Sequence, residues 1–209
     1  MTSAAGVHQG GKFIVVEGGD GSGKSTQARR LADRLRDAGH ETVLTREPGG
    51  TASGAALRQV LLEGSLDARA EALLMAADRA QHATEVIGPA LARGAWVVSD
   101  RFVPSSLVYQ GVGRALGVDA VEALSEFATA GISPDLVLVL DISDDVSKVR
   151  RASEDPDRFE RESEEFHARV REAYRSLAAQ RGWVVVDGNL EVDVVADKIW
   201  SVACERLEP

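Results

Sequence analysis

The chain has 209 residues, of which 44% are hydrophobic and 27% charged, a composition that predicts one globular domain with a single core. Its formal net charge of −9 argues against nucleic-acid binding, which needs a clustered Lys/Arg surface. No apolar run reaches the ~18 residues of a membrane span and residues 1–11 lack a signal-peptide pattern, so we expect a cytoplasmic protein that does not bind membranes.

Apolar runs alternate with helical segments along the chain. Residues 1–11 are small, polar and Gly-rich, which predicts a flexible N-terminal arm before a domain at 12–209. Continuous apolar runs separated by helices are typical of parallel crossover units. We therefore expect an α/β fold, a three-layer sandwich in which helices flank a five-stranded parallel sheet. The strands are expected at 13–16, 42–45, 96–99, 136–140 and 183–186, and the helices at 24–38, 53–93 (two helices), 143–180 and 192–207.

One segment differs from the rest of the predicted domain. Between residues 148 and 164 charged side chains dominate, Pro156 interrupts helical continuity, and little apolar surface is available for burial. This segment predicts a mobile flap.

Residues 18–25 match the phosphate-binding pattern G-x-x-x-x-G-K-[ST], after a predicted strand and at the start of a helix. Glycines let backbone N–H groups approach phosphate oxygens, and the helix N-terminus adds partial positive charge. Lys24 is expected to reach the β- and γ-phosphates and Ser25 to bind Mg²⁺. The fold is thus predicted to be of the P-loop NTPase type. The expected ATP-binding residues of the loop are Gly18, Gly19, Asp20, Gly21, Ser22, Gly23, Lys24, Ser25 and Thr26.

The sequence also indicates which nucleotide and which metal the loop binds. An Asn-Lys-x-Asp guanine-binding motif is absent, which favours ATP over GTP. One cysteine and four scattered histidines cannot build a structural zinc site, so the expected metal is Mg²⁺ held by carboxylate and phosphate. Asp100 and Asp141 each end an apolar strand, as the Walker-B acid does, and strand position alone does not choose between them.

Two arginines follow predicted strands on the expected ligand-binding edge of the sheet. Arg46 follows the second strand and Arg101 the third, and parallel sheets bind ligands at the carboxyl ends of their strands. A guanidinium can bridge two phosphate oxygens, so both arginines are candidates for holding a second phosphorylated substrate.

These motifs together resemble thymidylate kinases in order and spacing, from about residue 12 to the C-terminus. Beside the phosphate loop, the resemblance rests on T-R-E-P-G-G at 45–50, A-D-R at 77–79, D-R-F at 100–102 and Y-Q-G at 109–111. It implies transfer of the γ-phosphoryl group of ATP to dTMP, giving dTDP and ADP, by a homodimer. The acceptor oxygen is already anionic, so no general base is needed. The implied dTMP-binding residues are Asp20, Arg46, Pro48, Met75, Arg79, Arg101, Ser106, Tyr109 and Gln110.

The resemblance also implies individual roles. It favours Asp100 over Asp141 for the Mg²⁺ site, which leaves Asp141 as a helix N-cap. Arg79 would read the thymine edge, and Tyr109 would crowd the 2′ position of a ribose. Met75 stands where family members often place a Phe that stacks on thymine. One methyl group separates thymine from uracil, so modest activity on dUMP is expected.

The flap is expected to supply the catalytic arginine. Position 21 is Gly, and family members with Gly there use flap arginines instead of a basic loop residue. Arg151 matches the catalytic flap arginine and Arg158 a further ATP contact, so the expected catalytic set is Lys24, Asp100, Arg101 and Arg151. The alternative is an ordinary solvated helix with i,i+4 ion pairs. His82 is interpreted as a helix-surface residue without a role.

Two other functions remain open on this sequence. Another nucleoside or nucleotide kinase would differ in its acceptor profile. A P-loop switch would hydrolyse ATP without any acceptor.

Overall fold

The computed structural model describes residues 10–151 and 157–209, with only the backbone described for Arg151. Residues 1–9 of the predicted arm and 152–156 of the predicted flap therefore lie outside the described residues. Gly11, the last residue of the predicted arm, is buried, and a Cβ there would lie 2.7 Å from the Ala95 carbonyl oxygen.

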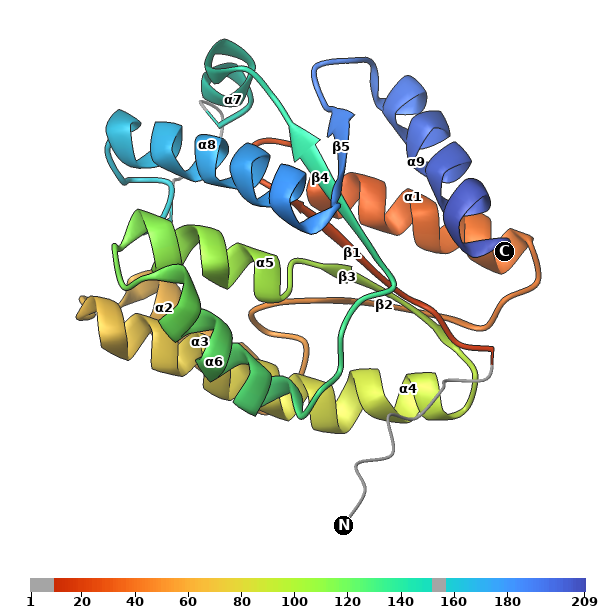
Figure 1. Cartoon of the computed structure of the whole chain (residues 1–209), viewed down its shortest axis with the longest axis horizontal. Coiled ribbons are helices and arrows are strands. Elements are labelled where there is room, and N and C mark those ends of the chain that lie inside the picture. Colours follow the sequence, from red (N-terminus) through yellow and green to blue (C-terminus); the bar gives the residue numbers. More distant parts are fainter. Residues whose placement is uncertain (1–9, 152–156) are drawn as a thin grey trace.

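A single five-stranded sheet forms the centre of the described chain, in the order β2-β3-β1-β4-β5 with every neighbouring pair parallel (Figure 1). The predicted α/β fold with a five-stranded parallel sheet flanked by helices is confirmed. Each strand begins within one residue of its expected position. The strands are β1 (Phe13–Gly18), β2 (Thr42–Arg46), β3 (Trp96–Asp100), β4 (Leu136–Asp141) and β5 (Val184–Asp187).

Helices cover both faces of the sheet (Figure 1). The helices α1 (Lys24–Asp37) and α9 (Val192–Leu207) pack on one face. The opposite face carries α4 (Gly88–Ala92), α5 (Val103–Ser106), the π-helical segments η1 (Ala83–Ile87) and η2 (Leu107–Gly113), and α8 (Glu164–Arg181). The remaining helices are α2 (Ala52–Glu63), α3 (Ala68–His82), α6 (Val118–Thr129) and α7 (Asp144–Arg151).

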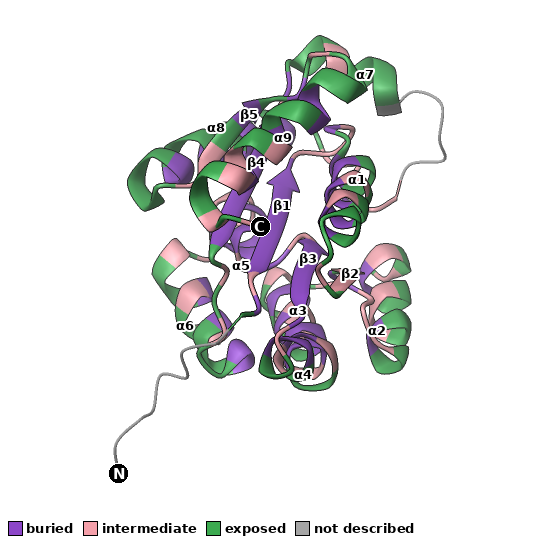
Figure 2. Cartoon of the chain, turned by 90° about the vertical axis from the view of Figure 1, so that its right-hand side faces the viewer, coloured by how far each residue is buried: buried purple, intermediate pink, exposed green. Residues whose placement is uncertain are grey.

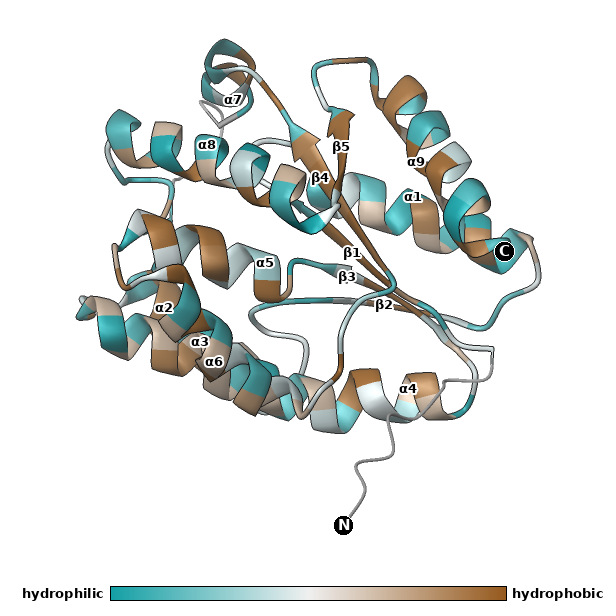
Figure 3. Ribbon diagram, viewed as in Figure 1, coloured by the Kyte–Doolittle hydropathy of each residue, from teal (hydrophilic) through white to brown (hydrophobic). Residues whose placement is uncertain are grey.

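The apolar side chains form two cores, one on each face of the sheet. Successive residues of β1 alternate between them: Phe13 and Val15 belong to the core under α8, whereas Ile14 and Val16 belong to the core under α1 and α9. The three central strands β1, β3 and β4 are accordingly buried on both faces (Figure 2) and hydrophobic (Figure 3), whereas the edge strands β2 and β5 are only partly buried. No helix in residues 10–151 and 157–209 combines the length and apolarity needed to cross a membrane.

Three features differ from the expected elements. The stretch 103–129, to which no element was assigned, folds into α5, η2 and α6. The predicted charged helical tract at 143–180 is divided into α7 and α8. Within the predicted flap, Phe159 is only 8% exposed and packs in the core under α8, so the described part of that segment does bury an apolar side chain.

Candidate active site

A cavity of about 560 Å³ opens where β1, β2 and β3 end at their carboxyl ends, the size of a small-molecule site. It brings together most of the residues that the sequence suggested. Gly18, Gly19, Ser22 and Arg158 do not line it, and the side chain of Arg151 lies outside the described residues. The expected residues that do line it are Asp20, Gly21, Gly23, Lys24, Ser25, Thr26, Arg46, Pro48, Met75, Arg79, Asp100, Arg101, Ser106, Tyr109 and Gln110.

The phosphate-binding loop connects β1 to the first turn of α1. Gly18, Gly21 and Gly23 have φ angles of 141°, 77° and 88°, a region that side chains with a Cβ rarely adopt. A Cβ on Gly18 would also lie 2.5 Å from the Leu140 carbonyl oxygen of β4. Glycine is therefore required both by the turn and by the packing of the loop against the sheet.

Lys24 is buried beneath this loop, and its ammonium donates a hydrogen bond to the Gly19 carbonyl oxygen at 2.8 Å. Burial and the nearby Arg101 lower the pKa of Lys24 to about 8, although Asp20, Asp100 and Glu17 oppose the change. An anion in the cavity would raise that pKa again, because it favours the charged ammonium.

Ser25 and Asp100 meet between the phosphate-binding loop and β3. The Ser25 hydroxyl donates to Asp100 Oδ2 at 2.5 Å, and Oδ1 of the same carboxylate is buried without a hydrogen-bond partner among the described residues. A buried carboxylate oxygen without a partner is costly, and a cation would satisfy it. This hydroxyl and carboxylate fit Mg²⁺, which takes oxygen ligands.

Asp141 lies elsewhere and does not cap α7. Its carboxylate accepts a hydrogen bond from Arg175 at 3.0 Å. The Ser143 hydroxyl instead accepts a hydrogen bond from the Val146 amide, at the spacing of an N-cap. The expectation that Asp141 caps this helix is wrong.

Arg101 crosses the cavity from the end of β3. It has a φ angle of 73°, uncommon for a residue with a Cβ. Its guanidinium donates to Asp20 Oδ1 at 2.6 Å and to the Ser105 hydroxyl at 3.1 Å, and it lies 5.2 Å from the Tyr109 ring centroid. Burial raises the pKa of Asp20, but Arg101 and Lys24 outweigh it and lower that pKa overall.

A buried glutamate in β1 holds the segment that carries Arg101. Glu17 is fully buried and accepts hydrogen bonds from the Phe102 amide at 2.8 Å, the Ser105 hydroxyl at 2.6 Å and the Tyr174 hydroxyl at 2.9 Å. Burial raises the pKa of Glu17 despite these bonds and the Arg101 charge. Because Phe102 follows Arg101 directly and Ser105 lies in the same segment, Glu17 fixes the backbone that positions this arginine.

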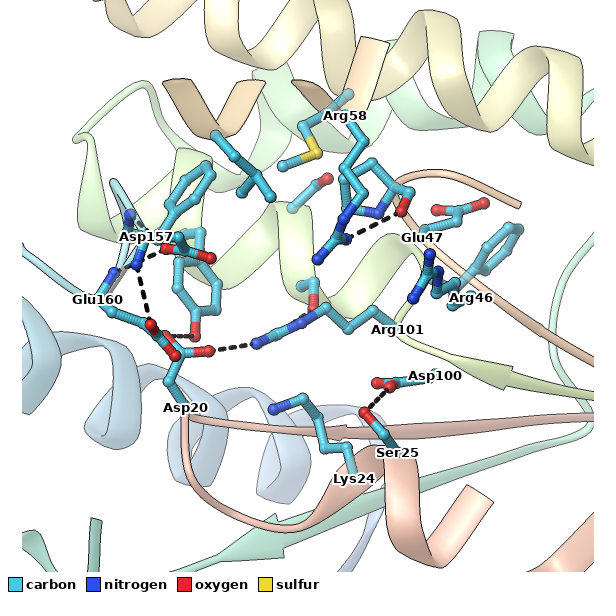
Figure 4. Close-up of a pocket in the computed structure, with 18 of the residues that line it drawn as sticks. Asp20, Lys24, Ser25, Arg46, Glu47, Arg58, Asp100, Arg101, Asp157 and Glu160 are labelled. Carbon is cyan, nitrogen blue, oxygen red and sulfur yellow. Dashed lines mark hydrogen bonds and ion pairs between the residues drawn. The ribbon is translucent and has the colours of Figure 1, made fainter. Parts of the chain in front are cut away.

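Arg46 and Arg58 face the same space from β2 and α2 (Figure 4). Arg58 donates a hydrogen bond to the Pro48 carbonyl oxygen at 3.0 Å. Burial and the nearby positive charge of Arg46 lower the pKa of Arg58. Two guanidiniums that repel each other in one cavity favour a shared anion, since an anion would relieve their repulsion.

The loop after β2 is held by a buried ion-pair network. Glu47 accepts from Arg79 Nε at 2.8 Å and lies 2.8 Å from His82 Nδ1, while the other ring nitrogen of His82 lies 2.6 Å from the Thr45 hydroxyl. His82 is fully buried, so its interpretation as a helix-surface residue is wrong. A Cβ on Gly50 would lie 2.6 Å from the His82 ring, so the loop at 45–50 packs directly against the imidazole.

Arg79 itself is 2% exposed and has four protein partners. Beside Glu47, its guanidinium donates to the Phe102 carbonyl oxygen at 3.0 Å and the Ser106 hydroxyl at 3.0 Å, with the Ser125 hydroxyl at 3.3 Å. Arg79 thus joins α3 to the segment after β3, at the edge of the cavity.

Residues 157–160 close one side of the cavity. Asp157 Oδ1 accepts hydrogen bonds from the Phe159 amide at 2.8 Å and the Glu160 amide at 3.0 Å, which fixes a turn. Arg158 points away from the phosphate-binding loop: it donates to the Leu61 carbonyl oxygen at 2.8 Å and pairs with Glu71 at 2.8 Å.

Several residues that line the cavity had been given no role. Arg58 carries no sequence signal, because one Arg on a helix is usually a surface residue. Residues 157–160 belong to the predicted mobile flap, in which Arg158 has an expected role but Asp157, Phe159 and Glu160 have none. Glu47 was part of the T-R-E-P-G-G string but could be linked to Arg79 only through the fold. The residues without an expected role are Glu47, Arg58, Leu62, Phe102, Ser105, Asp157, Phe159 and Glu160.

Comparison with known proteins identifies the family. The thymidylate kinase family model matches residues 16–199. The thymidylate kinase of Rhodopseudomonas palustris is 47% identical over 210 residues, covering 95% of this chain and 91% of the relative. Those of Thiobacillus denitrificans and Leifsonia xyli subsp. xyli are 47% and 48% identical, covering 90% of this chain and 94% and 92% of the relatives. The chain therefore belongs to the thymidylate kinase family.

Proposed function

We propose that this chain transfers the γ-phosphoryl group of ATP to dTMP, giving dTDP and ADP. One observation carries the proposal: Lys24 and Ser25 of the phosphate-binding loop line the same cavity as Arg46, Arg58 and Arg101. A nucleotide-binding switch needs only the first set of groups. A kinase needs both, because it must hold donor and acceptor phosphates together.

On the donor side, the backbone amides of residues 18–26 bind the phosphates of ATP, and Lys24 binds the β- and γ-phosphates. Ser25 and Asp100 hold Mg²⁺, directly or through water. When bound, the metal neutralises charge on the phosphate oxygens. The short Ser25–Asp100 contact and the unpartnered Asp100 Oδ1 support this assignment.

On the acceptor side, repulsion between two phosphates is the obstacle, about 4 kcal/mol for each pair of unit charges 4 Å apart at an effective dielectric near 20. Arg46, Arg58 and Arg101 bind the acceptor phosphate and offset that repulsion. Arg101 is aimed by Glu17 and Asp20, so little conformational entropy is lost when the phosphate arrives.

The base occupies the part of the cavity away from the phosphate-binding loop, and the sugar lies between the base and that loop. Arg79, Ser106 and Gln110 present polar groups there, and Met75 lines the same wall. Tyr109 donates to Asp20 at 3.2 Å and so has a fixed position next to the sugar, where it favours deoxyribose by steric exclusion. Pro48 completes the wall on the side of β2.

Arg151 supplies positive charge to the transferring phosphoryl group when the flap at 148–164 closes. Its place in α7 supports this, since the neighbouring Arg150 already donates to the Gly21 carbonyl oxygen at 3.3 Å. An ATP contact by Arg158 requires that residue to leave Glu71 and Leu61, and stays a prediction.

A homodimer is supported by apolar side chains that are unusually exposed on neighbouring helices. Phe127 of α6 is 87% exposed, Leu73 of α3 is 57% exposed and Val60 of α2 is 47% exposed. These helices lie together on one side of the chain (Figure 1). We also infer one domain at 12–209 after an N-terminal arm, and location in the cytoplasm, where ATP is available.

The proposal is tested by coupled-assay ADP release from MgATP across dTMP, dUMP, dCMP, dGMP and thymidine, with a control without acceptor. We expect turnover that depends on dTMP and is weaker with dUMP. Turnover with another acceptor alone would make the chain a different nucleotide kinase. ADP release without any acceptor would instead indicate an ATPase or switch.

A further inference from the structure

Glu71 lies in the first turn of α3, and its carboxylate is buried with 1% of the side chain exposed. It does not line the cavity. Three side chains bind it: Gln110 Nε2 donates to Oε1 at 2.7 Å, Arg114 Nε donates to Oε2 at 3.2 Å, and Arg158 Nη2 pairs with Oε2 at 2.8 Å. A buried carboxylate with this many partners is held in one orientation.

The contact with Glu71 decides which way the Gln110 amide points. An ionised carboxylate only accepts hydrogen bonds, so the NH₂ group of Gln110 must face Glu71. Gln110 is 1% exposed and lines the cavity, and none of the described residues donates a hydrogen bond to its Oε1. The carbonyl oxygen is therefore the atom left for a ligand in the cavity.

The positive and negative charges around Glu71 are equal in number, which favours a single arrangement of these side chains. Arg114 also pairs with Glu162 at 2.6 Å, so two guanidiniums face two carboxylates. The Arg114 guanidinium lies 4.8 Å from the Phe166 ring centroid, and that of Arg158 lies 4.5 Å from the Phe159 ring centroid. With both arginines packed on rings, Glu71 is fixed toward Gln110.

We propose that Glu71 is a positioning residue that sets base specificity by fixing Gln110 with its carbonyl oxygen toward the cavity. A fixed acceptor selects a base whose ring nitrogen carries a hydrogen, as the imide of thymine does. It rejects cytosine, whose ring nitrogen at that position is itself an acceptor. A Gln110 amide free to rotate would accept either base. The inference rests on the proposed function, because it assigns the base to this part of the cavity.

The test compares dissociation constants for dTMP and dCMP, measured by calorimetry on the full chain. Glu71→Gln preserves shape but lets Gln110 adopt either amide orientation. We expect the ratio of the dCMP constant to the dTMP constant to fall at least about tenfold. The matched control is Glu162→Gln, which perturbs Arg114 without touching Gln110 and should leave the ratio unchanged.

A fall of less than tenfold in Glu71→Gln, or an equal fall in Glu162→Gln, overturns the proposal. If Glu71→Gln does not fold, the double variant Glu71→Gln/Arg158→Gln restores the charge balance. It is compared with Arg158→Gln alone, and the same tenfold fall in the ratio of dissociation constants is required. Turnover of dTMP by the wild-type chain is measured separately. Its absence would reject the proposed function, whereas the ratios decide only the role of Glu71.

Discussion

The donor and acceptor halves of the cavity are built in different ways. The donor half is built mainly from one contiguous loop at 18–26, joined by Asp100 of β3, and we propose that its backbone amides bind most of the phosphate oxygens. The acceptor half is assembled from side chains on β2, α2, α3 and the segment after β3, joined by buried ion pairs such as Glu47–Arg79. We therefore expect substitutions in the donor half to affect chemistry alone, whereas those in the acceptor half also affect stability.

The largest effect is expected at Lys24. Lys24→Ala should abolish phosphoryl transfer, because no other described residue brings a positive charge from the phosphate-binding loop to the phosphates. Thermal unfolding should stay near the wild-type value, since Lys24 is buried at a cost in hydration. ADP release and circular dichroism check both parts. A variant that kept a tenth of wild-type kcat, or unfolded at a much lower temperature, would contradict the expected difference between the two halves.

A large effect limited to kcat is expected at Arg151. Arg151→Ala should lower kcat by about 10³ while the dissociation constant of dTMP changes little, because its charge acts on the transferring group. Lys148→Ala, in the same helix and exposed in its pair with Glu164, is the matched control. If kcat of Arg151→Ala stayed within about threefold of the wild-type value, Arg151 would not stabilise the charge of the transferring phosphoryl group.

A loss of stability is expected in the acceptor half. Glu47→Gln leaves Arg79 buried without its carboxylate, and removing one partner of a buried pair costs about 3–5 kcal/mol in the free energy of unfolding. The exposed pair Glu41–Arg93 is the control, and Glu41→Gln should cost about 0–1 kcal/mol. Urea denaturation measures both. Equal costs would mean that the acceptor network does not stabilise the fold.

The smallest effect is a dependence of ATP binding on pH. The pKa of Lys24 is lowered to about 8 in the free protein, and bound phosphates raise it because they favour the ammonium. ATP binding should therefore take up protons near and above pH 8 but almost none at pH 6.5, and affinity should fall as the pH rises above 8. Calorimetry in two buffers of different ionisation enthalpy measures the uptake. Uptake that persisted in Lys24→Met would assign it to another group.

The two halves also differ in how far the sequence predicts them. The phosphate-binding loop is contiguous, so its spacing and its flanking strand and helix are visible without the fold. Buried strands are equally visible, because their apolar runs are uninterrupted. The acceptor half depends on contacts between distant segments: His82 resembles a surface residue until the loop at 45–50 is seen packed on it.

The same cause explains other differences between expectation and structure. Arg58 enters the cavity because it packs against the loop that carries Pro48 and donates a hydrogen bond to the Pro48 carbonyl oxygen. The mixed apolar and polar stretch at 103–129 has π-helical turns that blur its periodicity. Phe159 is buried although its neighbours are charged.

In the proposed reaction, the donor and acceptor halves act on one phosphoryl group. The direct measurement incubates the chain with MgATP labelled in the γ-phosphate and dTMP, then separates the products. We expect the label to appear in dTDP and free phosphate to stay at the level of the control without enzyme. Label found as inorganic phosphate, with or without dTMP, would contradict it.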